Sequence, residues 1–181
     1  NLSLILDRLS GHAMKPLLIA CLCLIPWLTS ACKPSTQNMP QQSSLSHNQA
    51  VDIQNDISRL HNLSQRQNQE SAIFQQEALP AIRSGNSLQI AQIIEDMQQR
   101  VHKFNSELEN LLLSSAEVDS IRKKMMQSNQ LSLQLAQQGA AKRPDTQKII
   151  QLQQEIEQNQ QQISHLTQNA QAKISQAANM S

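Results

Sequence analysis

The chain has 181 residues, enough for one ordinary domain, and its composition is far from that of an average globular protein. It contains no Tyr, two Phe and three Gly but 30 Gln, which argues against a β-sheet and in favour of helices. The formal net charge is +1, and residues 33–181 carry equal numbers of acidic and basic side chains. This balance gives no field that would attract nucleic acid, so we expect no nucleic-acid partner.

Residues 14–31 have the features of a secretory signal peptide. Met14 and Lys15 are followed by an apolar run from Pro16 to Leu28. At about 13 residues this run is too short to cross a bilayer, but it suits the apolar part of a signal peptide with Lys15 as its positive start. We expect residues 1–13 to be an upstream non-native extension. The alternative is an extended positive region that includes Arg8.

The end of this segment, Leu28-Thr29-Ser30-Ala31-Cys32, resembles the lipobox of bacterial lipoproteins. In that pattern an apolar residue and two small residues precede an obligatory Cys, although Thr29 stands here where Leu is commoner. The resemblance implies cleavage between Ala31 and Cys32, a thioether-linked diacylglycerol on Cys32 and an acylated new amino terminus, with palmitate as the typical acyl chain. Lys33 follows in place of Asp, which in the enteric sorting rule of that family implies transfer to the outer membrane.

Two other cysteines, Cys21 and Cys23, lie inside the predicted signal peptide. Cys21 also follows a lipobox-like stretch, but too few apolar residues separate it from Met14. An ordinary signal peptide is the remaining alternative. Once the signal is removed, the mature chain keeps one thiol, which can form neither an internal disulfide nor a thiolate metal site.

Residues 32–46 then form the predicted lipidated Cys and a flexible linker. The stretch after the Cys is polar and contains Pro34 and Pro40. Fourteen linker residues give a root-mean-square reach of roughly 20 Å. The sequence therefore predicts a folded body, residues 47–181, that stands off the surface of the membrane on the periplasmic side.

Heptad spacing dominates this body and predicts an all-α, elongated antiparallel bundle with coiled-coil-like helices. One apolar stripe begins at Ile90 and one at Ile149, each with alternating spacings of three and four. The first helix and the segment from Val118 to Leu135 are less regular. The stripes are Ile90, Ile94, Met97, Val101, Phe104, Leu108 and Leu111, and then Ile149, Leu152, Ile156, Asn159, Ile163, Leu166 and Ala170. Asn159 either fixes the register inside the bundle or faces water.

Breakers and caps divide the body into three or four helices. Pro80 and the pair Gly85-Asn86 separate the first helix from the second. Gly139 fits a C-terminal cap, and Asp145 fits an N-cap. A capping box at Ser114–Glu117 could start a third helix. We favour one long middle helix with a kink near Ser114, and the alternative is four helices at 47–79, 86–113, 116–138 and 145–178.

No pattern in the body indicates catalysis, a metal or a cofactor. None of the four histidines outside the signal has a second histidine at i+3 or i+4. Asp52 and Asp56 share a helix face, but no third metal ligand lies nearby in the sequence. We expect this acidic pair, and the basic run from Arg122 to Lys124, to lie on solvated faces. An enzyme is therefore not expected.

The sequence favours a lipid-anchored scaffold or accessory subunit of the cell envelope. Its helical seams, which contain polar gaps, would bind a protein partner or a second copy. The alternative is a carrier or sensor that holds a small apolar ligand between helices, near Met97, Phe104, Met125 and Met126.

Overall fold

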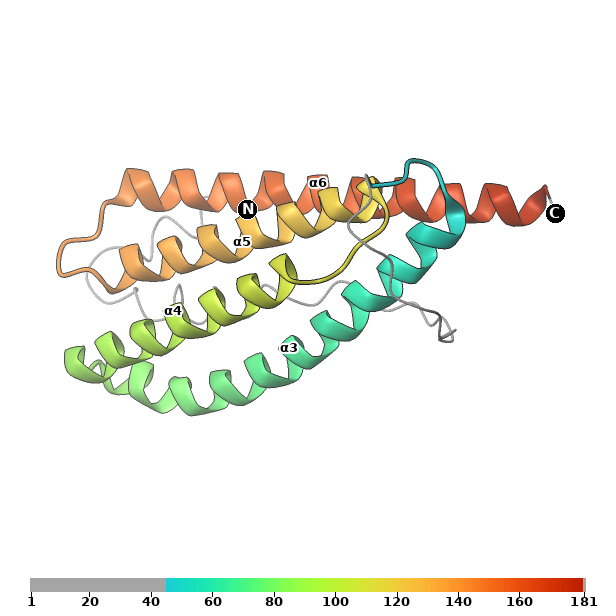
Figure 1. The fold of residues 1–181 in the computed structure, drawn as a ribbon. Helices are drawn as coiled ribbons and strands as arrows, with labels where there is room; N and C mark the ends of the chain where they lie inside the picture. Colours follow the sequence, from blue (N-terminus) through green and yellow to red (C-terminus); the bar gives the residue numbers. More distant parts are fainter. Residues whose placement is uncertain (1–44, 181) are drawn as a thin grey trace.

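The computed structural model describes residues 45–180, and four helices form its regular structure. They are α3 (Ala50–Ser84), α4 (Ser87–Glu109), α5 (Ala116–Ala140) and α6 (Thr146–Asn179). Consecutive helices run antiparallel, and the body is longer than it is wide (Figure 1). The predicted all-α helical bundle is confirmed. We call the end at which α3 and α5 begin and α4 and α6 finish the junction end, and the opposite end the loop end.

A break at residues 110–115 decides between the two architectures that the sequence left open. α4 ends at Glu109 and α5 begins at Ala116, so the chain reverses direction at this point. The expected long middle helix through Ser114 is therefore wrong, and the four-helix alternative is confirmed. The hydrogen bonds that hold the break lie at the junction end.

Short caps set the turn between α3 and α4. Gly85 closes α3 in the left-handed conformation with φ 71°, which a residue without Cβ adopts at no steric cost. Asn86 then accepts hydrogen bonds from the amides of Leu88 and Gln89 at the start of α4. Pro80 was expected to end the first helix, but α3 continues past it to Ser84. The helix is bowed along its length (Figure 1).

Of the two caps predicted for the turn between α5 and α6, the N-cap is confirmed and the C-cap is wrong. Asp145 is the N-cap of α6 and accepts a hydrogen bond from the amide of Lys148 at 3.1 Å, as predicted. Gly139 is not the C-cap of α5. It lies buried inside the last turn, and the helix ends after Ala140. A buried glycine allows close packing of neighbouring groups here and does not mark the helix end.

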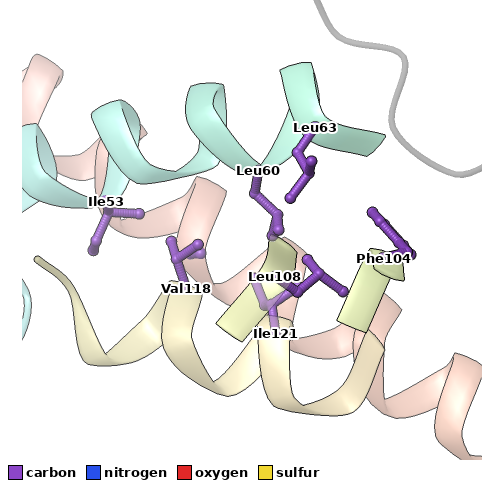
Figure 2. Close-up of a cluster of buried hydrophobic side chains, with 8 residues drawn as sticks. Ile53, Leu60, Leu63, Phe104, Leu108, Val118 and Ile121 are labelled. Carbon is purple, nitrogen blue, oxygen red and sulfur yellow. The ribbon is translucent and has the colours of Figure 1, made fainter. Parts of the chain in front are cut away.

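All four helices share one apolar cluster near the junction end. Side chains from α3 point toward those of α4 and α5 (Figure 2). Ala170 of α6 belongs to the same cluster. The cluster consists of Ile53, Leu60, Leu63, Phe104, Leu108, Val118, Ile121 and Ala170. Ile53, Leu108, Val118 and Ala170 have no exposed surface at all. This part of the bundle is therefore closed around a single core.

Toward the loop end the core divides in two, with α5 between the halves. Leu133 and Ala136 of α5 pack in a cluster with residues of α3 and α4, whereas Leu131 and Leu135 pack with residues of α6. The first cluster also contains Phe74, Ala78, Ile82 and Met97, and the second contains Leu152 and Ile156. A helix that buries two faces cannot show a single stripe. This explains why the sequence of this segment looked irregular.

Asparagines from α4 and α6 meet the middle of α5 at the same level. Asn159 is 3% exposed, and its amide donates to the carbonyl oxygen of Lys124 at 2.7 Å and to the hydroxyl of Ser128 at 2.9 Å. Asn129 donates to Asn105 of α4 at 2.7 Å. The interpretation of Asn159 as a buried register residue is therefore correct, and the solvent-facing alternative is wrong.

Candidate functional site

The residues predicted to carry the anchor lie outside the part that the structure describes. Ala31 and Cys32, with the predicted extension, signal peptide and most of the linker, precede residue 45. Lipidation of Cys32 therefore stays a prediction. The structure does describe the place where the predicted linker enters the folded body. This place, the junction end, is the candidate site.

The end of the predicted linker is fixed to the connection between α4 and α5. The amide of Ser46 donates to the carbonyl oxygen of Ser114 at 2.7 Å, and the amide of Ala116 donates to the carbonyl oxygen of Ser46 at 2.9 Å. These two bonds form a short parallel bridge between segments that are far apart in sequence. The hydroxyl of Ser46 also donates to Asp52 at 2.6 Å. The chain is therefore held firmly before α3 begins.

Glu117 joins three segments of the chain at this end. Its Oε1 accepts a hydrogen bond from the amide of Asn48 at 2.9 Å and an ion pair from Nζ of Lys173 in α6 at 2.7 Å. Burial alone would raise the pKa of Glu117, but the bonds from Lys173 and from the Asn48 amide hold the pKa of this carboxyl below its usual value. The charged form of Glu117 thus links the linker to α5 and α6.

Asp56 has no exposed surface and organises the break between α4 and α5 from its place on α3. Its Oδ2 accepts hydrogen bonds from the amides of Ser114 and Ser115, both at 2.7 Å, and from the hydroxyl of Ser115 at 2.9 Å. Arg59 lies 3.4 Å from Oδ1. A carboxylate out of water is costly unless it is hydrogen-bonded in this way, so the site and the break stabilise each other.

Two arginines bind carbonyl oxygens at the end of α4 and in the connection that follows it. Nη1 of Arg122 donates to the carbonyl oxygens of Leu108, Glu109 and Leu111 at 3.1 to 3.3 Å, while its other amino group pairs with Asp119. Arg59 donates to the carbonyl oxygen of Leu112 at 2.8 Å. Unpaired carbonyls at a helix C-terminus need such partners.

Two expectations about charged residues are wrong as a result. Asp56 was expected on a solvated face with Asp52, but it is fully buried. Arg122 was expected on a solvated face, yet its side chain is 18% exposed, in contrast to Lys123 at 70%. A signal for Asp56 exists in the sequence, because it lies three residues after Ile53 and four before Leu60. The carboxylate therefore belongs to the apolar stripe of α3.

The predicted capping box marks the right place but does not form the expected bonds. α5 begins beside it, with Ser115 as N-cap. The hydroxyl of Ser115 donates to Asp56 and makes no cap to its own helix, while the carboxylate of Glu117 is bound to Lys173 and to the Asn48 amide. Tertiary partners thus replace the local ones.

The residues named for a ligand pocket do not form one site. Met97 packs in the cluster of α3, α4 and α5 near the loop end, whereas Phe104 belongs to the core near the junction end, with Met125 and Met126 against it. Within residues 45–180, no three His, Cys, Asp or Glu side chains gather to ligate a metal. The described helices also include none with the length and hydropathy to cross a membrane.

A family model of known proteins matches most of the helical body. The family model described as "Uncharacterised lipoprotein PM1805" matches residues 54–175, from the first turns of α3 to the last turns of α6. Neither the curated proteins nor the solved structures contain a match. The match falls entirely within the helical body, whereas the lipobox resemblance at Cys32 precedes it. Two separate parts of the chain therefore indicate a lipoprotein.

Replacing Asp56 by Ala should destabilise the protein by about 3 kcal/mol or more, because two buried amides and a hydroxyl lose their acceptor. The matched control is Asp96→Ala on the exposed face of α4, which should change the free energy of unfolding by less than about 0.5 kcal/mol. Chemical denaturation followed by circular dichroism measures both. Equal effects of the two substitutions would contradict the role given to Asp56.

The lowered pKa of Glu117 predicts a dependence of stability on pH. A carboxyl whose pKa is lower in the folded state stabilises the fold above its unfolded pKa, and that stabilisation is lost as the pH falls through the folded value. The free energy of unfolding should therefore fall on acidification more steeply for the parent chain than for Glu117→Gln. Denaturation series from neutral to acidic pH test this, and parallel curves would show that Glu117 contributes nothing.

Proposed function

The chain belongs to the lipoprotein family described as "Uncharacterised lipoprotein PM1805", and from this premise we propose that it is a non-enzymatic, lipid-anchored scaffold or accessory subunit of the bacterial cell envelope. Membership of the family implies attachment to a membrane through lipid. We propose Cys32 as the lipid-bearing residue and the outer membrane, by way of Lys33, as its destination. The body then lies on the periplasmic side.

The hydrogen-bonded junction between linker and bundle is the observation that carries this proposal. Between Cys32 and the first bonded residue, Ser46, the chain can extend to at most about 50 Å. Ser46 and Asn48 are bonded to the α4–α5 connection and to Glu117, which in turn binds α6. An anchor at Cys32 would therefore restrain the whole bundle by one end, and the long faces of its helices would remain accessible to a partner.

The buried polar side chains of the bundle support a structural role. Asp56 binds the α4–α5 connection, and Asp119 pairs with Arg122, which caps α4. Asn129 and Asn159 join α5 to its two neighbours. Each of these groups is engaged in holding helices together, where an enzyme needs groups directed at a substrate. This is why we propose a binding function and not a reaction.

Fatty-acid labelling tests the anchor. Cells that express the chain with Cys32→Ser should incorporate no alkyne fatty acid into it, because the thiol that would carry the diacylglycerol is gone. Cys21→Ser and Cys23→Ser are matched controls and should label as strongly as the parent chain. Labelling that persists in Cys32→Ser and disappears in Cys21→Ser would move the anchor to the other cysteine.

Site-specific photo-crosslinking in intact envelopes tests the scaffold. A photoreactive residue is placed in turn at Gln65 of α3, Gln92 of α4 and Gln161 of α6, which are all exposed. We expect discrete protein adducts from one of these faces and few from the others, because a scaffold binds through a defined surface. No protein adduct from any face, together with lipid that copurifies with a monomer, would favour the carrier alternative.

A further inference from the structure

The outer side of α6 carries a second run of residues with heptad spacing. Starting at Gln151, the positions advance by three and four residues in alternation, and all of them are exposed. The run, which we call the amide stripe, consists of Gln151, Gln154, Gln158, Gln161, His165 and Gln168. It lies opposite the buried positions Leu152, Ile156 and Asn159. α6 lies along one edge of the bundle, next to α5 (Figure 1).

This stripe carries little charge, as does the outer side of α5, where Lys123 is the exposed charged residue. None of its residues carries a formal charge when His165 is neutral. Of the charged residues of α6, Glu157 is exposed, and Lys148, Glu155 and Lys173 are partly exposed. α4, by comparison, exposes Glu95, Asp96 and Lys103 along a shorter helix. An uncharged helix face of this length requires little desolvation of charge when another surface covers it.

We propose that the amide stripe binds the same stripe of a second copy of this chain, in a parallel pair of α6 helices at the membrane. The inference rests on the proposed lipid anchor. Each anchored copy is tethered at its junction end, so two copies on one membrane can pack side by side with that end nearer the lipid in both. Two such copies meet by rotation about an axis along their length, which places equivalent helices side by side and parallel.

The chemistry of the stripe fits this arrangement. Where a two-fold axis runs along a parallel pair, each residue at the contact faces its own counterpart, and a charged residue would face the same charge. A Gln amide has both a donor and an acceptor and can bond to its own copy. The flanking acidic residues also avoid one another, because at coiled-coil spacing Glu157 lies opposite Gln162 of the second copy and Glu155 lies opposite Ile150.

Anchoring makes a weak contact sufficient. An amide-lined helix pair buries little apolar surface, so its affinity in dilute solution is low. Attachment of both copies to one membrane raises their effective concentration, as a linker does for two joined modules. The pair is therefore a property of the anchored protein, and the same chain released into solution should be largely monomeric.

Cysteine crosslinking in intact envelopes tests both the surface and the direction. Gln154→Cys, Gln161→Cys and Gln168→Cys are introduced singly, with Gln65→Cys on the exposed face of α3 and the parent chain as controls. Mild oxidation should give several-fold more disulfide-linked homodimer at all three stripe positions than at Gln65. A dimer from only one of the three would overturn the parallel register, and yields no higher than the Gln65 control would overturn the contact itself.

Charge exchange separates a direct contact from a folding defect. In the Gln154→Cys background, Gln161→Glu or Gln161→Lys alone should reduce the dimer several-fold, and coexpression of the two should restore it through the mixed pair. Fatty-acid labelling of the same samples reports the anchor separately. A labelled chain without the dimer would refute this inference and leave the anchor intact. A Gln154→Cys chain that also carries Cys32→Ser and dimerises as well as Gln154→Cys alone would refute the dependence on the membrane.

Discussion

The carboxylate of Asp56 is the group around which the chain reversal between α4 and α5 is built. In one continuous helix, the amides of Ser114 and Ser115 would be bonded to carbonyl oxygens four residues earlier and could not reach a carboxylate on α3. With the helix broken, both amides are free and point at Asp56. The buried charge thus requires the break, and the break provides the donors that make the charge tolerable. These hydrogen bonds fix where the chain reverses, and the direction of α5 and the position of α6 depend on that reversal.

The placement of α5 between its neighbours sets the rest of the packing. Near the loop end it contacts α4 and the end of α3 on one side and α6 on the other, so it buries more of its surface than the outer helices. Apolar contacts alone would allow neighbours to slide along such a helix by a turn. Asn159 and the pair Asn105–Asn129 oppose sliding, because each must find a polar partner on α5 at one level. Such buried polar residues lower the stability of the bundle but allow a single register of the helices.

Sequence reasoning worked where a helix buries one face and failed where partners are distant. The stripes from Ile90 and Ile149, the turn at Gly85-Asn86 and the cap at Asp145 depend on neighbours within a few residues, and their outcome agrees with the pattern. The break after Glu109 depends on a carboxylate more than fifty residues earlier in the sequence. The heptad spacing of the apolar stripe continues through the break, so it does not reveal the end of α4. The low exposure of Asp56 and Arg122 does not follow from local sequence, because charged side chains are usually exposed.

The two ends of the bundle differ in how many contacts must be lost before a helix can separate. At the junction end four helices share one core. Hydrogen bonds and ion pairs of Ser46, Glu117 and Asp56 there join segments that are far apart in the sequence, from the residues before α3 to α6. At the loop end α6 packs on α5 alone, apart from the cluster of α3 and α4. Local opening therefore costs less at the loop end. The proposed anchor at Cys32 would hold the protein at the junction end, where the helices resist separation most, and would leave the more separable end farther from the lipid.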